Sequence, residues 1–235
     1  PKNRKLFGSS REDDLALLTK LAYEGLRYRY PRSDREAKAR VEKELKVIHE
    51  LHFDAYFLIT WDIIRYARSR GYFHVGRGSG ANSIVAYCLG ITDVDPVALD
   101  LYFERFINPH RTSPPDFDID FSWDERNDII DYIFKRYGAK HVCLLATYVT
   151  FRDKSIYREL AKVFGLPKAE IDAWLDPATA IREVSSEIQS LIVKYGNLLL
   201  DYPNYLSIHA GGILISEEPL FAYTALEPMP KGFPI

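Results

Sequence analysis

The run at residues 115–121, Pro-Asp-Phe-Asp-Ile-Asp-Phe, constrains the fold of this chain more than any other segment. Its acidic and apolar residues alternate strictly, which predicts a β-strand. Residues two apart in a strand face the same way and lie about 6.6 Å apart along it. One face of the predicted strand therefore carries three carboxylates, Asp116, Asp118 and Asp120. The other face carries two phenylalanines and an isoleucine, which can pack on a hydrophobic core.

Three like charges on one face repel one another unless something offsets them. A divalent cation does so directly, because Mg²⁺ prefers oxygen ligands and usually binds one or two carboxylates together with substrate phosphates. Two such ions about 3.5–4 Å apart would clamp the attacking and leaving oxygens of a phosphoryl transfer. A solvated acidic face on an edge strand explains the same alternation, so the motif alone leaves both interpretations open.

A glycine-rich loop at residues 76–80, Gly-Arg-Gly-Ser-Gly, precedes a short apolar helix predicted from about Ala81 to Leu89. Free backbone N–H groups at a helix N-terminus bind anions, and glycines let a phosphate come close. Arg77 adds a positive charge, and Ser79 adds a hydrogen-bond donor. The loop is not a Walker A motif, because no Gly-Lys-Ser/Thr follows at the required spacing. A flexible turn is the alternative interpretation of a lone glycine loop.

Further basic residues are candidates for phosphate contacts. Arg105 lies in the run Phe-Glu-Arg-Phe at residues 103–106, where it either pairs with Glu104 at the edge of a core or reaches a phosphate. A second group forms a stripe of basic residues, four apart, on a predicted helix: Lys154, Arg158 and Lys162. A solvated helix face and a surface that follows a nucleic-acid backbone explain this stripe equally well.

The remaining pattern predicts an α+β fold. Apolar residues at spacings of three and four indicate helices on both sides of Pro31, through residues 53–71 and through residues 124–138. The run Ser-Asp-Arg-Glu at 33–36 has the form of a capping box that starts one of them. Between short predicted strands at 141–146 and 212–216, the chain is predicted to be helical from 151 to about 205. This pattern predicts that the chain has three parts: a mixed α and β core at 1–146, a helical insertion at 147–205 and a return to the core at 206–235.

The charge balance of 31 basic and 33 acidic residues, a net charge of −2, argues at first against a nucleic-acid partner. The distribution is uneven, however. Acidic residues gather around 116–131, where a metal can offset some of them, whereas arginines and lysines gather elsewhere. No stretch approaches the ~20 apolar residues of a membrane span, so no membrane partner is expected. Cys88 and Cys143 lie in apolar runs and are predicted to be buried thiols, which fits a cytoplasmic location.

Taken in order, these motifs resemble the palm of the bacterial C-family replicative DNA polymerases, the DNA polymerase III alpha subunits. The shared runs are Gly-Arg-Gly-Ser at 76–79, Gly-Ile-Thr-Asp at 90–93, Phe-Glu-Arg-Phe at 103–106 and the acidic strand at 115–121. The resemblance covers essentially the whole chain. Departures such as Ala-Asn-Ser at 81–83 look more like the error-prone branch of that family.

The resemblance implies a palm like that of the nucleotidyltransferases, a mixed sheet packed with helices, with a helical thumb inserted at 147–205. It places Asp116 and Asp118 at the first two catalytic carboxylates, which bind Mg²⁺, with Asp120 beside them. A further set is implied to bind the nucleotide triphosphate: Gly78, Ser79, Arg77 and Arg105. The basic stripe is implied to contact DNA, because Lys154 matches a lysine of the thumb that touches the primer–template duplex.

The implied function is template-directed nucleotidyl transfer from a deoxynucleoside triphosphate to a primer 3′-hydroxyl by a two-metal mechanism. The third catalytic aspartate of the family lies beyond Ile235, so the chain is expected to be a palm–thumb fragment that is inactive alone. Expected partners are primer–template DNA, deoxynucleoside triphosphates and, through regions absent here, a sliding clamp and other replication proteins. The alternatives are a non-catalytic DNA-binding or scaffold module on the same fold and a template-independent nucleotidyltransferase.

Overall fold

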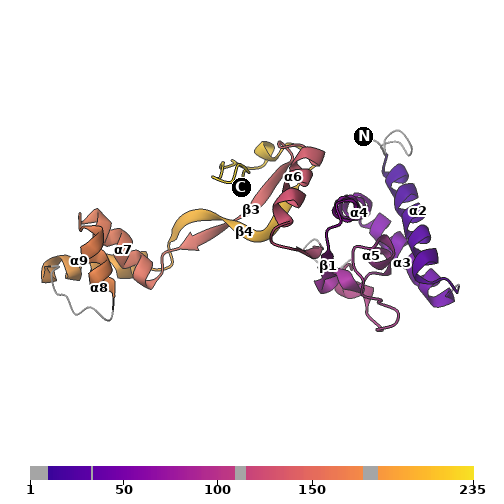
Figure 1. Cartoon of the computed structure of the whole chain (residues 1–235), viewed down its shortest axis with the longest axis horizontal. Coiled ribbons are helices and arrows are strands. Elements are labelled where there is room, and N and C mark those ends of the chain that lie inside the picture. The colour runs from indigo at the N-terminus through magenta and orange to yellow at the C-terminus, as the bar shows by residue number, and fades with distance from the viewer. Residues whose placement is uncertain (1–9, 33, 109–114, 177–184) are drawn as a thin grey trace. The chain divides into compact units, whose positions relative to one another are not determined.

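The computed structural model forms two compact units, Pro1–Arg136 and Tyr137–Ile235, and each unit has its own hydrophobic core (Figure 1). The structure describes residues 10–32, 34–108, 115–176 and 185–235, without the side chains of Asp153, Lys154 and Ser186.

The first unit is built mainly from helices: α2 (Arg11–Arg29), α3 (Arg35–Glu50), α4 (Asp54–Ser69), α5 (Ile84–Leu89) and α6 (Arg126–Tyr137). The apolar residues at helical spacing face inward and form one core. Its fully buried members include Leu18, Ile48, Phe57, Ile84 and Phe106. Two short 3₁₀ helices, Gly78–Asn82 and Phe103–Arg105, lie on either side of α5 in the sequence.

The predicted helices on both sides of Pro31 are confirmed as α2 and α3, but the predicted start of α3 is wrong in detail. Its N-cap is Asp34, whose carboxylate accepts hydrogen bonds from the amides of Glu36 and Ala37 at 2.8 and 3.1 Å. Ser33, the predicted cap, lies outside the described residues. Aspartate caps a helix as well as serine does, so the helix forms as predicted although its cap lies one residue later in the sequence.

The strands pair as two antiparallel ribbons. In the first unit β1 (His74–Arg77) pairs with β2 (Asp118–Phe121), and in the second β3 (Val142–Thr150) pairs with β4 (Pro203–Ile215). Across the described part of the chain these are two separate two-stranded antiparallel sheets, whereas the resemblance implied a palm with a mixed sheet. The α+β class is confirmed.

The second unit carries three helices in the sequence between its paired strands: α7 (Asp153–Val163), α8 (Lys168–Leu175) and α9 (Ser186–Leu199). They share a small core of Ala161, Ile171 and Ile192. The helical region ends at Leu199, earlier than predicted, and β4 begins at Pro203. Asp201 has a left-handed φ of +66°, and Pro203 has no N–H to extend a helix, so the chain leaves the helical conformation here.

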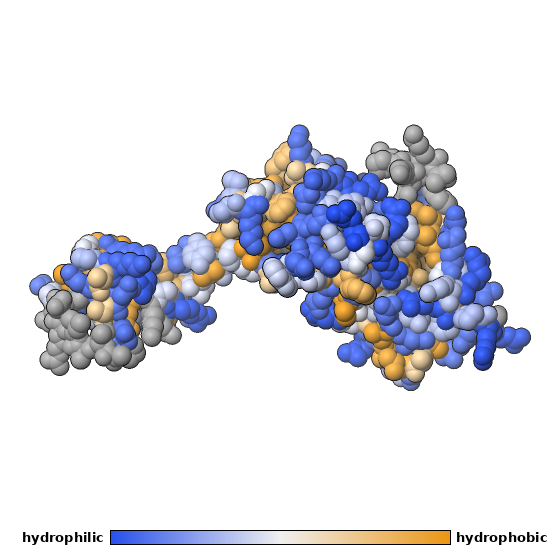
Figure 2. Space-filling view, in the orientation of Figure 1, coloured by the Kyte–Doolittle hydropathy of each residue, from blue (hydrophilic) through white to orange (hydrophobic). Residues whose placement is uncertain are grey.

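Hydrophilic residues cover much of the visible face, and apolar residues come to the surface there in separate patches (Figure 2). On the ribbon of the second unit, the exposed apolar side chains include Tyr148, Tyr205 and Leu214. Both cysteines, Cys88 and Cys143, are buried free thiols, as predicted. Among the described helices, none is long and apolar enough to cross a membrane.

Candidate functional site

The acidic run forms a strand as predicted, but the strand is shorter than expected. β2 starts at Asp118, and Asp116 precedes it as an exposed residue. The antiparallel pairing places Gly76 opposite Ile119 and Arg77 opposite Asp118. The glycine-rich loop and the acidic run, which lie about forty residues apart in the sequence, are therefore neighbours.

The apolar face of the run packs on the helical core, as the alternation predicted. Phe117, Ile119 and Phe121 are partly buried against the core of the first unit. The Phe117 ring is stacked on Tyr56, with 5.2 Å between ring centroids, and meets Phe57 edge-on at the same distance. The Phe117 amide also donates a hydrogen bond to the Tyr56 hydroxyl at 2.7 Å. These contacts fix the backbone between Asp116 and Asp118.

On the acidic face an arginine offsets the carboxylates. The Nε of Arg77 donates to Asp120 Oδ2 at 2.7 Å, and its Nη1 lies 3.5 Å from Asp118 Oδ2. All three side chains are more than two-fifths exposed, so each pair contributes only about 0–1 kcal/mol to stability. The sequence predicted that Arg77 binds a phosphate and missed this pairing, because the two strands lie about forty residues apart and no local pattern reports their register.

The donor set of this face fits a hard cation. Asp118 and Asp120 present carboxylate oxygens on one side of a strand, partly open to solvent, and Mg²⁺ commonly binds one or two carboxylates plus substrate oxygens. The described residues contain no group of three histidine, cysteine, aspartate or glutamate side chains that could hold a metal ion. The three aspartates are thus not gathered into one such group.

The turn after β1 lies directly against Asp118. Gly78 has a left-handed φ of +69°, and a Cβ at this position would lie 2.4 Å from Asp118 Oδ2. A Cβ on Gly80 would lie 2.6 Å from the Phe117 ring. Glycine is required at Gly78 both for the backbone conformation and for the close approach. The Gly78–Asn82 turn and the acidic strand therefore form one packed unit, with Ser79 half-buried in that turn.

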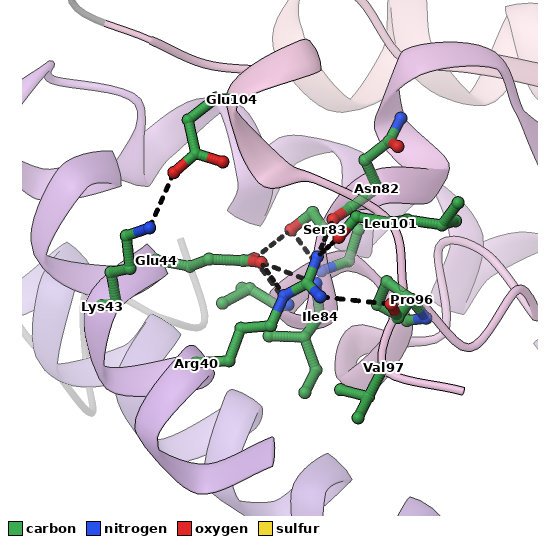
Figure 3. A network of polar contacts seen from close by, with 12 residues as sticks. Arg40, Lys43, Glu44, Asn82, Ser83, Ile84, Pro96, Val97, Leu101 and Glu104 are labelled. Atoms are coloured by element: carbon green, nitrogen blue, oxygen red, sulfur yellow. Dashed lines mark hydrogen bonds and ion pairs between the residues drawn. The ribbon is translucent and has the colours of Figure 1, made fainter. Parts of the chain in front are cut away.

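The helix after the glycine-rich loop starts later than predicted. The chain first makes the 3₁₀ turn Gly78–Asn82, and α5 begins only at Ile84, after the N-cap Ser83. Its first amides are already bonded, because those of Ile84 and Val85 donate to the carboxylate of Glu44 at 3.1 and 3.2 Å (Figure 3). These amides are not free to bind a phosphate. Glu44 was not singled out from the sequence, because the contact spans forty residues.

Arg105 is an exposed residue at the end of the 3₁₀ helix Phe103–Arg105, between the buried Phe103 and Phe106. The alternative of a Glu104–Arg105 salt bridge is wrong, because Glu104 pairs with Lys43 of α3 at 2.6 Å. None of the described acidic residues forms an ion pair with Arg105. Its guanidinium is therefore open to a ligand from solution.

In the second unit the predicted basic stripe is largely neutralised. Arg158 pairs with Asp172 of α8 at 2.5 Å, and Lys162 pairs with Glu159 at 2.6 Å. Lys154 belongs to α7, but its side chain lies outside the described part of the chain. A role of these residues in DNA binding stays a prediction.

Comparison with known families decides the relationship. The model of the bacterial DNA polymerase III alpha NTPase domain matches residues 16–232. The chain belongs to this family. The resemblance seen in the sequence is thereby confirmed, and the match covers nearly all of both units.

Similarity to individual curated proteins agrees with this family assignment. The chain is 38% identical over 235 residues to the error-prone DNA polymerase of Symbiobacterium thermophilum, covering 92% of this chain and 22% of that protein. It is 41% identical over 225 residues to the error-prone DNA polymerase of Pseudomonas syringae pv. tomato, with 89% of this chain and 22% of that protein covered. The chain thus spans about a fifth of the length of these relatives. Their names agree with the error-prone branch expected from the sequence.

Proposed function

We propose that the chain is the palm–thumb part of a DNA-directed DNA polymerase, which transfers a nucleotidyl group from a deoxynucleoside triphosphate to a primer 3′-hydroxyl on a template. The observation that carries the proposal is the packing of the Gly78 turn against Asp118, with Arg77 between the two motifs. A site for phosphoryl transfer needs metal-binding carboxylates beside a phosphate-binding turn. The contact between the Gly78 turn and Asp118 supports such a site here.

In this proposal Asp116 and Asp118 would hold Mg²⁺, with Asp120 as a neighbouring ligand. Two bound ions would stabilise the charge that develops on the attacking and leaving oxygens. The protein's own contribution is positioning and electrostatics. Ser79 and the amides of the Gly78–Asn82 turn orient the β and γ phosphates.

Two arginines complete the nucleotide site in the proposal. Arg77 neutralises phosphate charge once it leaves the carboxylates, and Arg105, exposed at the end of its turn, approaches the triphosphate from solvent. The planar guanidinium suits both roles, because it presents several N–H donors to phosphate oxygens.

The wider assignments belong to the same proposal. Residues 1–146 and 206–235 form the palm and 147–205 the thumb, which is supported by three helices between the paired strands β3 and β4. Lys154, Arg158 and Lys162 contact the primer–template duplex. The whole protein acts in the cytoplasm with deoxynucleoside triphosphates, a sliding clamp and other replication proteins, and this fragment alone does not extend a primer.

Primer extension with Mg²⁺ tests the proposal. The full-length protein that contains this chain should extend a primer only on a template, and Asp118→Asn should abolish extension. Asp131→Asn, which changes a partly exposed aspartate on α6, is the matched control and should leave extension intact. DNA binding without extension would support the scaffold alternative, and extension without template would support a template-independent enzyme. Robust extension by the isolated fragment would contradict its proposed inactivity.

A further inference from the structure

Helix α3 presents three charged side chains, Arg40, Lys43 and Glu44, toward the segments that carry the proposed nucleotide ligands (Figure 3). We call these three residues the α3 bracket. No pattern in the sequence singles them out. Their contacts reach two turns, Gly78–Asn82 and Phe103–Arg105, which are separated by α5 and a loop.

Glu44 is the buried part of the bracket. Its side chain is fully buried, and its carboxylate accepts the Ser83 hydroxyl at 2.7 Å and the amides of Ile84 and Val85. A buried carboxylate is costly unless hydrogen bonds and an opposite charge compensate it. The carboxylate therefore fixes the exact point at which the Gly78–Asn82 turn ends and α5 begins.

Arg40 joins three separate segments to Glu44. Its guanidinium donates to the carbonyl oxygens of Asn82 at 2.9 Å and Pro96 at 3.1 Å, and also to that of Leu101. Its Nε lies 3.4 Å from Glu44 Oε1. A planar guanidinium holds its donors in a rigid fork, so these carbonyls keep a fixed separation. Asn82 closes the first turn, and Leu101 precedes the second.

Lys43 binds the second turn from outside. Its ammonium pairs at 2.6 Å with Glu104, the residue next to Arg105. Both side chains are more than half exposed, so the pair contributes little to overall stability. Its consequence is local, because it holds the short 3₁₀ helix that ends in Arg105.

From these contacts we infer that Arg40, Lys43 and Glu44 are positioning residues that set the distance between the Gly78–Asn82 turn and Arg105. This inference rests on the proposed function, in which one triphosphate bridges the two turns. None of the three residues touches the substrate. Their effect follows from preorganisation, since a displacement of about 1 Å at a reacting site can reduce the rate roughly 100-fold.

A charge swap separates positioning from simple electrostatics. In the full-length polymerase, Lys43→Glu and Glu104→Lys each break the pair, whereas the double variant restores it with reversed charges. Positioning predicts that both single variants raise the KM for the nucleotide about two- to fivefold and that the double variant restores it. Electrostatics alone predicts opposite shifts, because Glu104→Lys adds a positive charge near the phosphates. A lowered KM in Glu104→Lys, or no rescue in the double variant, would overturn the inference.

Glu44→Gln tests the buried part of the bracket. The amide keeps the size of the side chain but cannot accept all three hydrogen bonds or pair with Arg40. We expect the KM for the nucleotide to rise about 10- to 100-fold, with primer–template affinity unchanged. Glu50→Gln, at the exposed end of the same helix, is the matched control and should leave the KM unchanged. A purely structural role would lower the active fraction without changing the KM of the molecules that remain folded.

The outcomes distinguish this inference from the function on which it rests. If the unaltered full-length protein incorporates no nucleotide on a template, the proposed function fails. If it does incorporate nucleotide and the KM is the same in all the bracket variants, only the positioning role is refuted. The charge swap decides the matter if Glu44→Gln does not fold, because it changes only exposed side chains.

Discussion

Arg77 and Asp120 form a diagonal ion pair across the β1–β2 ribbon, with the guanidinium Nε 2.7 Å from the carboxylate oxygen. The same guanidinium lies 3.5 Å from Asp118, the residue paired with Arg77 in the strand register. One arginine thus offsets two carboxylates that the proposed reaction assigns to metal binding. In the proposed function, a cation that binds this face competes with Arg77, which then turns toward a phosphate.

Removing this competitor should strengthen metal binding. We expect Arg77→Ala to tighten Mn²⁺ binding to the chain about two- to fivefold, the range that corresponds to an exposed ion pair. Isothermal titration calorimetry measures the change. Lys135→Gln, which breaks an exposed pair with Asp131 on α6, is the control and should leave the affinity unchanged. Equal or weaker binding by Arg77→Ala would show that the arginine does not block the carboxylates.

Alanine substitutions at two glycines with left-handed backbones, Gly71 and Gly78, distinguish the effect of backbone strain from the effect of the contact with Asp118. Gly71→Ala should lower the free energy of unfolding by about 1–2 kcal/mol, because φ is +77° and nothing lies within 4 Å of the added Cβ. Gly78→Ala should lower it by a similar amount and also abolish nucleotide incorporation, because its Cβ would displace the Asp118 carboxylate. Urea unfolding and primer extension measure the two effects. Equal stability and equal primer extension by the two variants would rule out a specific role for the Gly78 contact.

The Tyr56 hydroxyl should support the acidic strand. Tyr56→Phe keeps the ring that stacks on Phe117 but removes the acceptor of the Phe117 amide. An unsatisfied amide costs about 1–3 kcal/mol, and we expect a loss of that size in the free energy of unfolding. Tyr28→Phe, at an exposed tyrosine of α2, should cost almost nothing. The prediction fails if chemical denaturation gives the same stability for both variants.

Stability should depend on pH through Glu44. Burial raises the pKa of its carboxyl from 4.5 to about 7, while its hydrogen bonds and Arg40 limit the rise. The folded chain then keeps a proton that the unfolded chain has released, so the contribution of Glu44 to stability decreases as pH rises from about 4.5 to about 7. Urea unfolding across this range measures the slope. Glu44→Gln should make the decrease smaller, whereas Glu50→Gln should keep it; equal slopes in all three proteins would contradict the prediction.

Local patterns predicted much of the fold correctly. The alternation at 116–121 and the spacing of apolar residues in α2, α3 and α4 depend on neighbouring residues, and the structure confirms these elements. The prediction was less accurate where an element ends. The start of α5 and the end of α9 depend on a few competing local bonds, which short patterns do not resolve.

For the candidate site, too, local patterns and long-range contacts contributed different information. Residue types and spacing singled out the carboxylates, the glycine turn and Arg105 as candidates but left other interpretations open. The resemblance to the family implied that they bind metal and phosphate, and these roles stay predictions. Only the tertiary structure decided that Arg77 lies opposite Asp118 and that Glu44 occupies the start of α5. Both contacts join segments about forty residues apart. Strand register and helix packing determine such contacts, and neither leaves a periodic signal in the sequence.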